Sequence, residues 1–338
     1  KKESALKSNP SEFSGPTEAT NAPNDIKIAL IPSDSRLHGV VAPADAAEEA
    51  AKELGWIVQR YDGGGTPDQQ NKAILNAVSW GADVIVNISI DPNLVQQGIK
   101  AAKEAGVLIV SGSNGIDSPN PVLNMEEGKE TYSFDVGPDY AALGEAIADW
   151  IIVDSDGQAN IVVFSDKEFP SVLALEAGLM EELKKCADCT IQPIEYFTGS
   201  QVGSTLGQKT VGYLRSNPEV NYIFSPFDPA AAAQVTAIKQ GGLSDQAKLI
   251  SVLGNQQNID FIRKDEVQVA DGAYDNVYMG YAIIDQVIRS LNNQDLFEPH
   301  GENLPYVVLD KTNLPEPGND WISSFDYKSK FLELWGVK

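Results

Sequence analysis

Short runs of apolar, largely β-branched residues alternate with longer amphipathic stretches along most of the chain. Five such runs lie in the first half, at residues 27–32, 56–61, 84–88, 107–111 and 131–135. Five more lie in the second half, at residues 160–164, 190–197, 221–225, 248–253 and 267–271. Short strands separated by helix-length segments are typical of βαβ units and parallel sheets. The pattern therefore predicts an α/β protein.

Prolines and glycines mark the ends of the predicted helices. Proline suits the first helical turn, where its missing N–H needs no partner, and it occupies such places at Pro43, Pro67, Pro92, Pro138, Pro170 and Pro229. Glycine adopts the positive φ with which a chain leaves a helix, at Gly55, Gly81, Gly106 and Gly241. A further helix is expected over residues 277–293, then a strand at 306–309 and a short helix over 327–335.

The two halves of the chain repeat one plan, because Asp91-Pro92 and Asp228-Pro229 each follow a strand and open a helix. We expect the helix at 277–293 to return to the first sheet and the last strand to the second. The chain then crosses between the halves three times, near residues 135–138, 271–275 and 298–305. Such crossings form a hinge when both sheets stay rigid.

These expectations give a fold and its domain boundaries. We predict two doubly wound parallel-sheet domains joined by a three-crossing hinge. The predicted N-terminal lobe holds residues 25–135 and 274–300, and the C-terminal lobe holds residues 136–273 and 301–338.

Residues 1–24 are rich in Ser, Asn, Pro, Thr and Glu and lack hydrophobic periodicity. This composition is typical of a linker, so we predict a flexible leader. Such a leader suits an exported protein that is tethered to a membrane by a group upstream of Lys1, for instance a lipidated cysteine. A remnant of the expression system is the alternative.

Charge and hydropathy exclude two kinds of partner. The 338 residues include 48 acidic and 25 basic side chains, for a formal net charge of −23. A field of this sign repels nucleic acid and anionic membranes. No stretch reaches the run of about 18 apolar residues that a membrane span needs.

The two cysteines, Cys186 and Cys189, lie in the segment KKCADCT. They follow the basic end of a helix, whereas a redox CxxC motif needs a helix N-terminus after a strand. Two thiols are also too few for a structural zinc site. A small local disulfide and two free thiols both stay open, with a structural or incidental role in either case.

Motifs of the common enzyme classes are missing from the sequence. No GxGxxG follows the first strand, and neither a GxSxG elbow nor a P-loop occurs. His38 and His300 lie far apart in the chain, and nothing indicates a catalytic triad. We expect no catalysis, no cofactor and no metal.

From about residue 26 to residue 309 the chain resembles the type I periplasmic solute-binding proteins, in the subgroup of ribose- and other sugar-binding proteins of ABC importers. The resemblance rests on the order and spacing of IKIALIPSDS, AAKELGW, GADVIVNISIDPNLV, AAKEAGVLIVSGS and NYIFSPFDPAAAAQVTAIKQGG. It implies a ligand held between the carboxyl ends of the strands of two lobes. Helix N-termini and loop side chains also converge there in open α/β sheets.

The loops after the predicted strands supply the candidate ligand-binding residues. They are Asp34, Arg36, His38, Asp91, Ser113, Asn114, Phe169, Phe227, Asp228, Asn255, Tyr274 and Asp275.

Several of these residues have a second interpretation. Asp34 and Arg36 either hydrogen-bond ligand hydroxyls or a carboxylate, or belong to a solvated loop. Phe227, like Phe169, either stacks on an apolar ligand face or packs the hinge core. The two Asp-Pro acids precede a helix, so N-capping alone explains them.

The sequence departs from the sugar-binding pattern at three places. Such relatives commonly carry paired aromatics in the first loop, an Asp-Arg pair after the fourth strand and an arginine in the helix after the sixth. The matching positions here hold Gly39 and Val40, Ser113 and Asn114, and Leu175. The usual sugar-clamping groups are thus absent from those positions.

We therefore expect a monomeric extracytoplasmic solute-binding protein, periplasmic or at the cell surface. It closes around a small molecule and presents it to the permease of an ABC importer. A sugar or polyol is the expected ligand, and a cyclic compound with a less polar face is the alternative. The runner-up function is a sensory module that reports a small cyclic or aromatic ligand to a membrane receptor.

Overall fold

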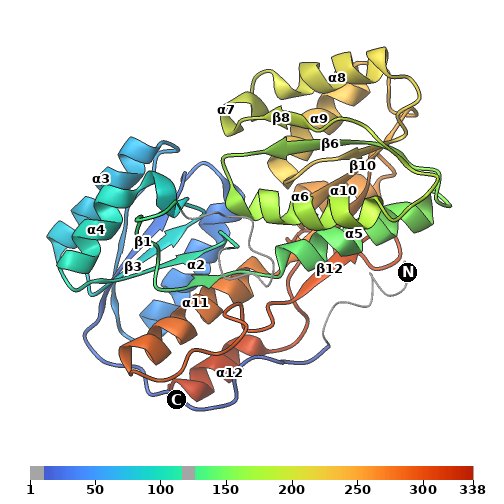
Figure 1. The fold of residues 1–338 in the computed structure, drawn as a ribbon. Helices are drawn as coiled ribbons and strands as arrows, with labels where there is room; N and C mark the ends of the chain where they lie inside the picture. Colours follow the sequence, from blue (N-terminus) through green and yellow to red (C-terminus); the bar gives the residue numbers. More distant parts are fainter. Residues whose placement is uncertain (1–10, 116–125, 338) are drawn as a thin grey trace.

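The computed structural model describes residues 11–115 and 126–337, which form two α/β lobes (Figure 1). Each lobe has a central sheet with helices on both faces. The predicted α/β fold with two parallel-sheet lobes is confirmed.

The first sheet is parallel, in the order β2-β1-β3-β4-β5. Its strands are β1 (Lys27–Pro32), β2 (Ile57–Arg60), β3 (Val84–Ile88), β4 (Leu108–Gly112) and β5 (Asp135–Val136). One face is covered by α2 (His38–Glu53) and α11 (Asn276–Leu291), and the other by α3 (Pro67–Trp80), η1 (Pro92–Leu94) and α4 (Gln96–Glu104). Alternate β1 residues enter the two cores, because successive strand side chains point to opposite faces.

The second sheet runs β12-β11-β10-β9-β6-β7, with β8 also paired to β6 and only its edge strand β12 antiparallel. Its strands are β6 (Asn160–Asp166), β7 (Thr190–Ile191), β8 (Glu195–Phe197), β9 (Tyr222–Phe224), β10 (Lys248–Leu253), β11 (Gln268–Tyr274) and β12 (Tyr306–Leu309). Its helices are α5 (Tyr140–Asp154), α6 (Pro170–Leu183), α7 (Gly199–Val202), α8 (Leu206–Ser216), α9 (Asp228–Gln240) and α10 (Gln256–Arg263).

Some local expectations are wrong. The strand expected at 131–135 overlaps β5 only at Asp135. Gly241, which was expected to have positive φ, ends α9 with φ −76°, and the positive φ of 69° falls on Gly242.

Two further expectations fail at prolines. The predicted strand at 190–197 is split into β7 and β8, and Pro193 between them has no N–H to donate to a neighbouring strand. Pro43 lies inside α2 and does not begin it. The helix starts a turn earlier because the Leu37 carbonyl already accepts the N–H groups of Val40 and Val41.

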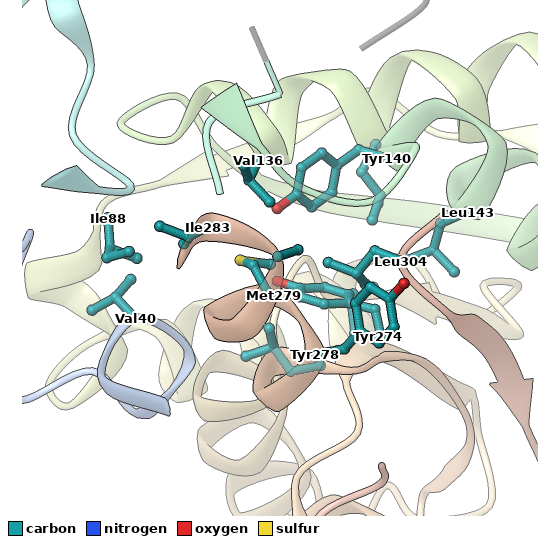
Figure 2. Close-up of a cluster of buried hydrophobic side chains, with 14 of the residues drawn as sticks. Val40, Ile88, Val136, Tyr140, Leu143, Tyr274, Tyr278, Met279, Ile283 and Leu304 are labelled. Carbon is teal, nitrogen blue, oxygen red and sulfur yellow. The ribbon is translucent and has the colours of Figure 1, made fainter. Parts of the chain in front are cut away.

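The three predicted crossings between the lobes are confirmed. The chain passes from β5 in the first sheet to α5 and β6 in the second, from β11 to α11, and from α11 to β12. Figure 2 shows the buried side chains where these crossings meet, with Met279 and Ile283 on α11. The other labelled residues of this cluster are Val40, Ile88, Val136, Tyr140, Leu143, Tyr274, Tyr278 and Leu304.

The last helix of the chain does not pack on the second lobe, although the predicted boundary assigned all of residues 301–338 to that lobe. Helix α12 (Tyr327–Leu334) lies against α11, on the side of the first sheet (Figure 1). Tyr327, Phe331 and Trp335 are spaced by four residues, so they share one helical face that packs on Tyr278 and Tyr281. The chain thus makes a fourth crossing, over residues 320–326.

Residues 11–24 are also packed, whereas a flexible leader was expected. The Phe13 ring lies 6.1 Å from Tyr278 and 5.3 Å from Phe331, between ring centroids. Thr20 N donates to the Leu334 carbonyl at 2.8 Å, and Trp56 Nε1 donates to the Pro23 carbonyl at 2.8 Å. Phe13 anchors this segment to α11 and α12, although the polar composition of residues 1–24 predicted no such packing. Residues 1–10 lie outside the described part of the chain.

A buried ion pair on α11 joins both terminal segments. Arg289 Nε donates to Asp285 at 2.5 Å, and these side chains are 3% and 0% exposed. The other Asp285 oxygen accepts the Trp335 indole N–H at 2.7 Å, and Arg289 donates to the Glu18 carbonyl at 3.0 Å. Losing one partner of such a pair strands a buried charge, so the pair fixes both segments to α11.

Cys186 and Cys189 form a disulfide, which answers the question that the sequence left open. The bond closes a loop of a few residues after α6. So short a loop restricts the unfolded chain little.

We predict that Phe331→Ala lowers the free energy of unfolding by about 3–5 kcal/mol, because it empties a fully buried aromatic site. Urea denaturation measures this loss. Ile322→Ala is the control, because this side chain in the same tail is 51% exposed, and we expect a change within about 0.5 kcal/mol. Equal losses for the two variants would show that α12 does not hold the fold.

Candidate ligand-binding site

A cleft lies between the lobes where the carboxyl ends of both sets of strands converge. It encloses about 610 Å³ of empty space, part of it open to solvent. The first lobe contributes Leu37, Gly39, Val40, Ser89 and Ser113. The second lobe and the crossings contribute Tyr140, Phe169, Ser171, Val172, Leu175, Pro226, Phe227, Pro229, Val252, Leu253 and Tyr274. These residues lie at the ends of strands, in the loops that follow, or in the first two turns of the next helix, as expected for a site in an α/β fold.

Two phenylalanines form part of the second-lobe wall. Phe169 and Phe227 are the residues before α6 and α9, and their ring centroids are 6.1 Å apart with planes at 84°. Phe197 of β8 supports Phe227 from behind, with centroids 5.7 Å apart, and it does not line the cleft. Edge-to-face rings of this kind hold one another in place.

Hydroxyl groups gather on the hinge side of the cleft. Ser113 Oγ and the Tyr140 hydroxyl are 3.0 Å apart, and Ser89 Oγ donates to the Ser113 carbonyl at 3.2 Å. The rings of Tyr140 and Tyr274 meet edge-on at 5.8 Å. Burial raises the pKa of Tyr274 to about 12 and raises the pKa of Tyr140 well above its ordinary value, so both are neutral hydroxyls near pH 7.

Three non-glycine residues of the cleft have positive φ. The values are 54° at Ser89, 62° at Ser113 and 134° at Leu253. Side chains other than glycine rarely adopt this region, and such strain persists where the surrounding structure enforces it. Strained backbone of this kind is concentrated at binding sites, and here it sets the direction of three lining side chains.

Four of the twelve predicted residues line this cleft, namely Ser113, Phe169, Phe227 and Tyr274. Residues that the prediction missed include Tyr140, Ser171 and Leu253. The signal for Tyr140 was its place directly after the first crossing. The apolar residues gave no signal, because a valine or leucine at a strand end also reads as core.

Asp228 turns into the second lobe and away from the cleft. Its carboxylate accepts Ser251 Oγ at 2.5 Å and Asn255 N at 2.7 Å, so it does not cap its own helix either. Burial, together with the neighbouring Asp271 carboxylate, raises the pKa of Asp228 well above its ordinary value. Gly254 N donates to Asp271 at 3.0 Å. The two acids fix the loop that follows Leu253, the last residue of β10.

In the first loop the solvated interpretation fits Arg36, whereas Asp34 is buried. Asp34 accepts from Arg36 Nε at 2.8 Å, and the arginine side chain is 80% exposed. This hydrogen bond lowers the pKa of Asp34. Neither side chain lines the cleft.

The remaining candidates also lie off the cleft and have structural partners or burial instead. Asp91 caps the short helix η1 by accepting Asn93 N at 2.8 Å, as its capping interpretation predicted. Asn114 is fully buried, and Asn255 precedes α10. Asp275 caps α11 by accepting the N–H groups of Val277 and Tyr278.

His38 forms an ion pair across the lobes. Its Nε2 lies 2.7 Å from Asp320 Oδ2, and the other Asp320 oxygen accepts Gln256 N at 2.8 Å. His38 opens α2 in the first lobe, whereas Gln256 opens α10 in the second. Asp320 of the fourth crossing therefore bridges both lobes beside the cleft.

Within residues 11–115 and 126–337, no cluster of His, Cys, Asp or Glu is arranged to hold a metal ion. No helix in those ranges is long and apolar enough to cross a membrane.

Comparison with protein families identifies the family of the chain. The family described as a periplasmic binding protein domain matches residues 28–295. The chain belongs to this family. A periplasmic binding protein is an extracytoplasmic binding protein and not an enzyme, which agrees with a cleft shared by two lobes. Comparison with curated proteins finds no match.

Solved structures of periplasmic binding proteins share this fold. The Caulobacter myo-inositol binding protein is 20% identical with a TM-score of 0.74, covering 88% of this chain and 97% of that chain. A sugar ABC transporter protein from Yersinia enterocolitica is 18% identical with a TM-score of 0.75, covering 95% and 99%. The fructose binding periplasmic domain of a hybrid two component system is 15% identical with a TM-score of 0.72, covering 86% and 92%.

We predict that the His38–Asp320 pair makes unfolding pH-dependent. The hydrogen bond to Asp320 raises the pKa of His38 above its ordinary 6.5, so the pair stabilises the fold fully below about pH 6.5. The stabilisation is lost as the pH rises through the folded pKa. It is small, because the His38 side chain is 49% exposed.

Melting curves of wild type and His38→Gln between about pH 5 and pH 9 test this. The difference in melting temperature should be largest at the acidic end and shrink as the pH rises. Asp320→Asn should remove the same pH dependence. A difference that stays constant with pH would contradict the prediction.

Proposed function

We propose that this protein captures a small molecule in the cleft by hinge closure and presents it to the permease of an ABC importer. The observation that carries the proposal is the composition of the cleft wall, which both lobes and two crossing segments supply. A ligand that touches both lobes stabilises the closed arrangement relative to an open one, in which one set of contacts is lost.

The hinge has the construction that such a motion needs. The crossings after β5 and β11 enter the helices α5 and α11, and their cleft-facing residues Tyr140 and Tyr274 contact each other. Both sheets are close-packed and move as rigid units. The two walls come close together at Gly39 of α2 and Leu253 of β10. A Cβ atom added to Gly39 would lie only 2.9 Å from Leu253 Cδ1.

Two ligand classes are compatible with this function. The solved relatives include a myo-inositol binding protein and a fructose binding domain, so a sugar or polyol is one class. A small cyclic compound with an apolar face is the other.

Sensing is a second candidate function, and a specific relative favours it. One structure with this fold is the periplasmic domain of a hybrid two component system. Both functions use the closed form as the signal, so the cleft is the same in each. Binding of purified permease, or of a receptor's periplasmic domain, by ligand-loaded protein separates them. Attachment to a membrane through a lipid upstream of Lys1 suits either function.

A thermal-shift screen of sugars, polyols, amino acids, nucleosides and neutral ring compounds tests the proposal. A ligand that binds the folded state raises its melting temperature. Small-angle scattering of the same sample should then show a smaller radius of gyration. A ligand that raises the melting temperature without compaction would contradict hinge closure.

We predict that Gly39→Leu abolishes this ligand response, because the new side chain meets Leu253 and fills the cleft. Gly212→Leu is the matched control, since a Cβ at Gly212 of α8 meets no atom within 4 Å. The control should keep both the thermal shift and the compaction. An unchanged response in Gly39→Leu would place the ligand elsewhere.

A further inference from the structure

The cleft lining has an unusual chemistry for a site that closes on a small solute. Of the described residues that line it, none is charged and none carries an amide side chain. Eleven are apolar or glycine, and the other five are Ser89, Ser113, Ser171, Tyr140 and Tyr274. The cleft thus offers hydroxyl groups alone as side-chain hydrogen-bonding partners within residues 11–115 and 126–337.

Several of these hydroxyls already have partners. Ser113 Oγ and the Tyr140 hydroxyl bond each other at 3.0 Å, and Ser89 Oγ donates to the Ser113 carbonyl at 3.2 Å. All three side chains are buried. They form one small polar group on the hinge side, while the walls on either side of it are hydrocarbon.

This distribution disfavours charged and hydroxyl-rich ligands. An ion buried without a counter-charge loses its hydration and gains little in return. Each hydroxyl of a sugar buried without a partner also costs its lost hydrogen bonds with water. A polyol has such groups on every carbon, whereas the polar partners here are confined to one side.

The aromatic wall matches a different shape of ligand. Phe169 and Phe227 pack edge-to-face directly before the first residues of α6 and α9. Val172 and Leu175 in the first two turns of α6 continue this wall. Across the cleft, Leu37 and Val40 of the first lobe complete an apolar slot. A ring that enters this slot buries both of its faces against hydrocarbon. Its edge then faces the cluster of serine and tyrosine hydroxyls on the hinge side.

We infer that the cleft takes a neutral cyclic compound with an apolar ring and one or two hydrogen-bonding groups on its edge, in preference to a free sugar or polyol. The inference rests on the proposed function, because it names the ligand class of the same cleft.

Six-membered carbocycles with increasing numbers of hydroxyl groups test it directly. Protein refolded from denaturant, to remove bound ligand, is titrated calorimetrically with cyclohexanol, trans-1,2-cyclohexanediol and myo-inositol. We expect the diol to bind at least about 10-fold more tightly than myo-inositol. In parallel, 4-methylphenol should bind and 4-methylbenzoate should not, because they differ in charge at one position. Binding of the ring should give a negative heat-capacity change.

Paired leucine substitutions locate the ring. Phe227→Leu keeps the wall apolar and removes its aromatic face, so we expect about a 3- to 10-fold loss of affinity for 4-methylphenol. Phe261→Leu is the control, because this partly buried ring of α10 does not line the cleft, so we expect less than about a 2-fold loss. Melting of both ligand-free variants reports on folding separately.

The outcomes separate the inference from the function on which it rests. Tighter binding of myo-inositol, ribose or allitol than of cyclohexanol, the diol and 4-methylphenol, with compaction in scattering, overturns the inference and supports the function. Failure of all the ring compounds to bind at millimolar concentration also overturns the inference. The function itself fails only if a ligand that does bind, such as one recovered by mass spectrometry of protein purified from cells, causes no compaction.

Discussion

The buried carboxylate of Asp275 joins the start of α11 to the segment of the fourth crossing and the first residue of α12. One of its oxygens accepts the N–H groups of Val277 and Tyr278 at 3.0 and 2.9 Å, at the start of α11. The carboxylate also accepts Ser323 N at 2.7 Å and the Tyr327 hydroxyl at 3.2 Å, from the fourth crossing. Burial raises the pKa of Asp275, and these donors offset part of that rise. The direction of α11, and with it the packing of both terminal segments, depends on this group.

That fourth crossing changes the mechanics of a two-lobed protein. Trp321 N donates to the Gly254 carbonyl in the second lobe, Asp320 contacts His38 in the first, and α12 then packs on α11. Each opening of the lobes has to stretch or shift this segment as well as the three connections common to the fold. Trp321 packs in the second lobe, Ser323 N is held by Asp275, and α12 packs on α11, so this segment is fixed at both ends and between them.

The cleft shows how one fold accommodates different ligands. Backbone topology brings the same strand ends together whatever side chains they carry, so the position of the site follows from the sheets alone. Its chemistry follows from the side chains at those ends. Here the acids near the cleft are engaged elsewhere: Asp228 fixes the loop after β10, and Asp34 pairs with an exposed arginine. What remains at the surface of the cleft is hydrocarbon with a small group of hydroxyls.

The sequence by itself determined the strands, the helices and the pairing of halves, because these depend on local hydrophobic periodicity and on proline and glycine geometry. It also placed Ser113, Phe169, Phe227 and Tyr274 at strand ends. Only the tertiary structure decided which loop side chains face the cleft, because a carboxylate such as Asp228 has the same local pattern whether it turns toward a ligand or a buried serine. It alone showed that Phe13 and α12 pack on α11, since contacts between residues hundreds of positions apart leave no local periodicity.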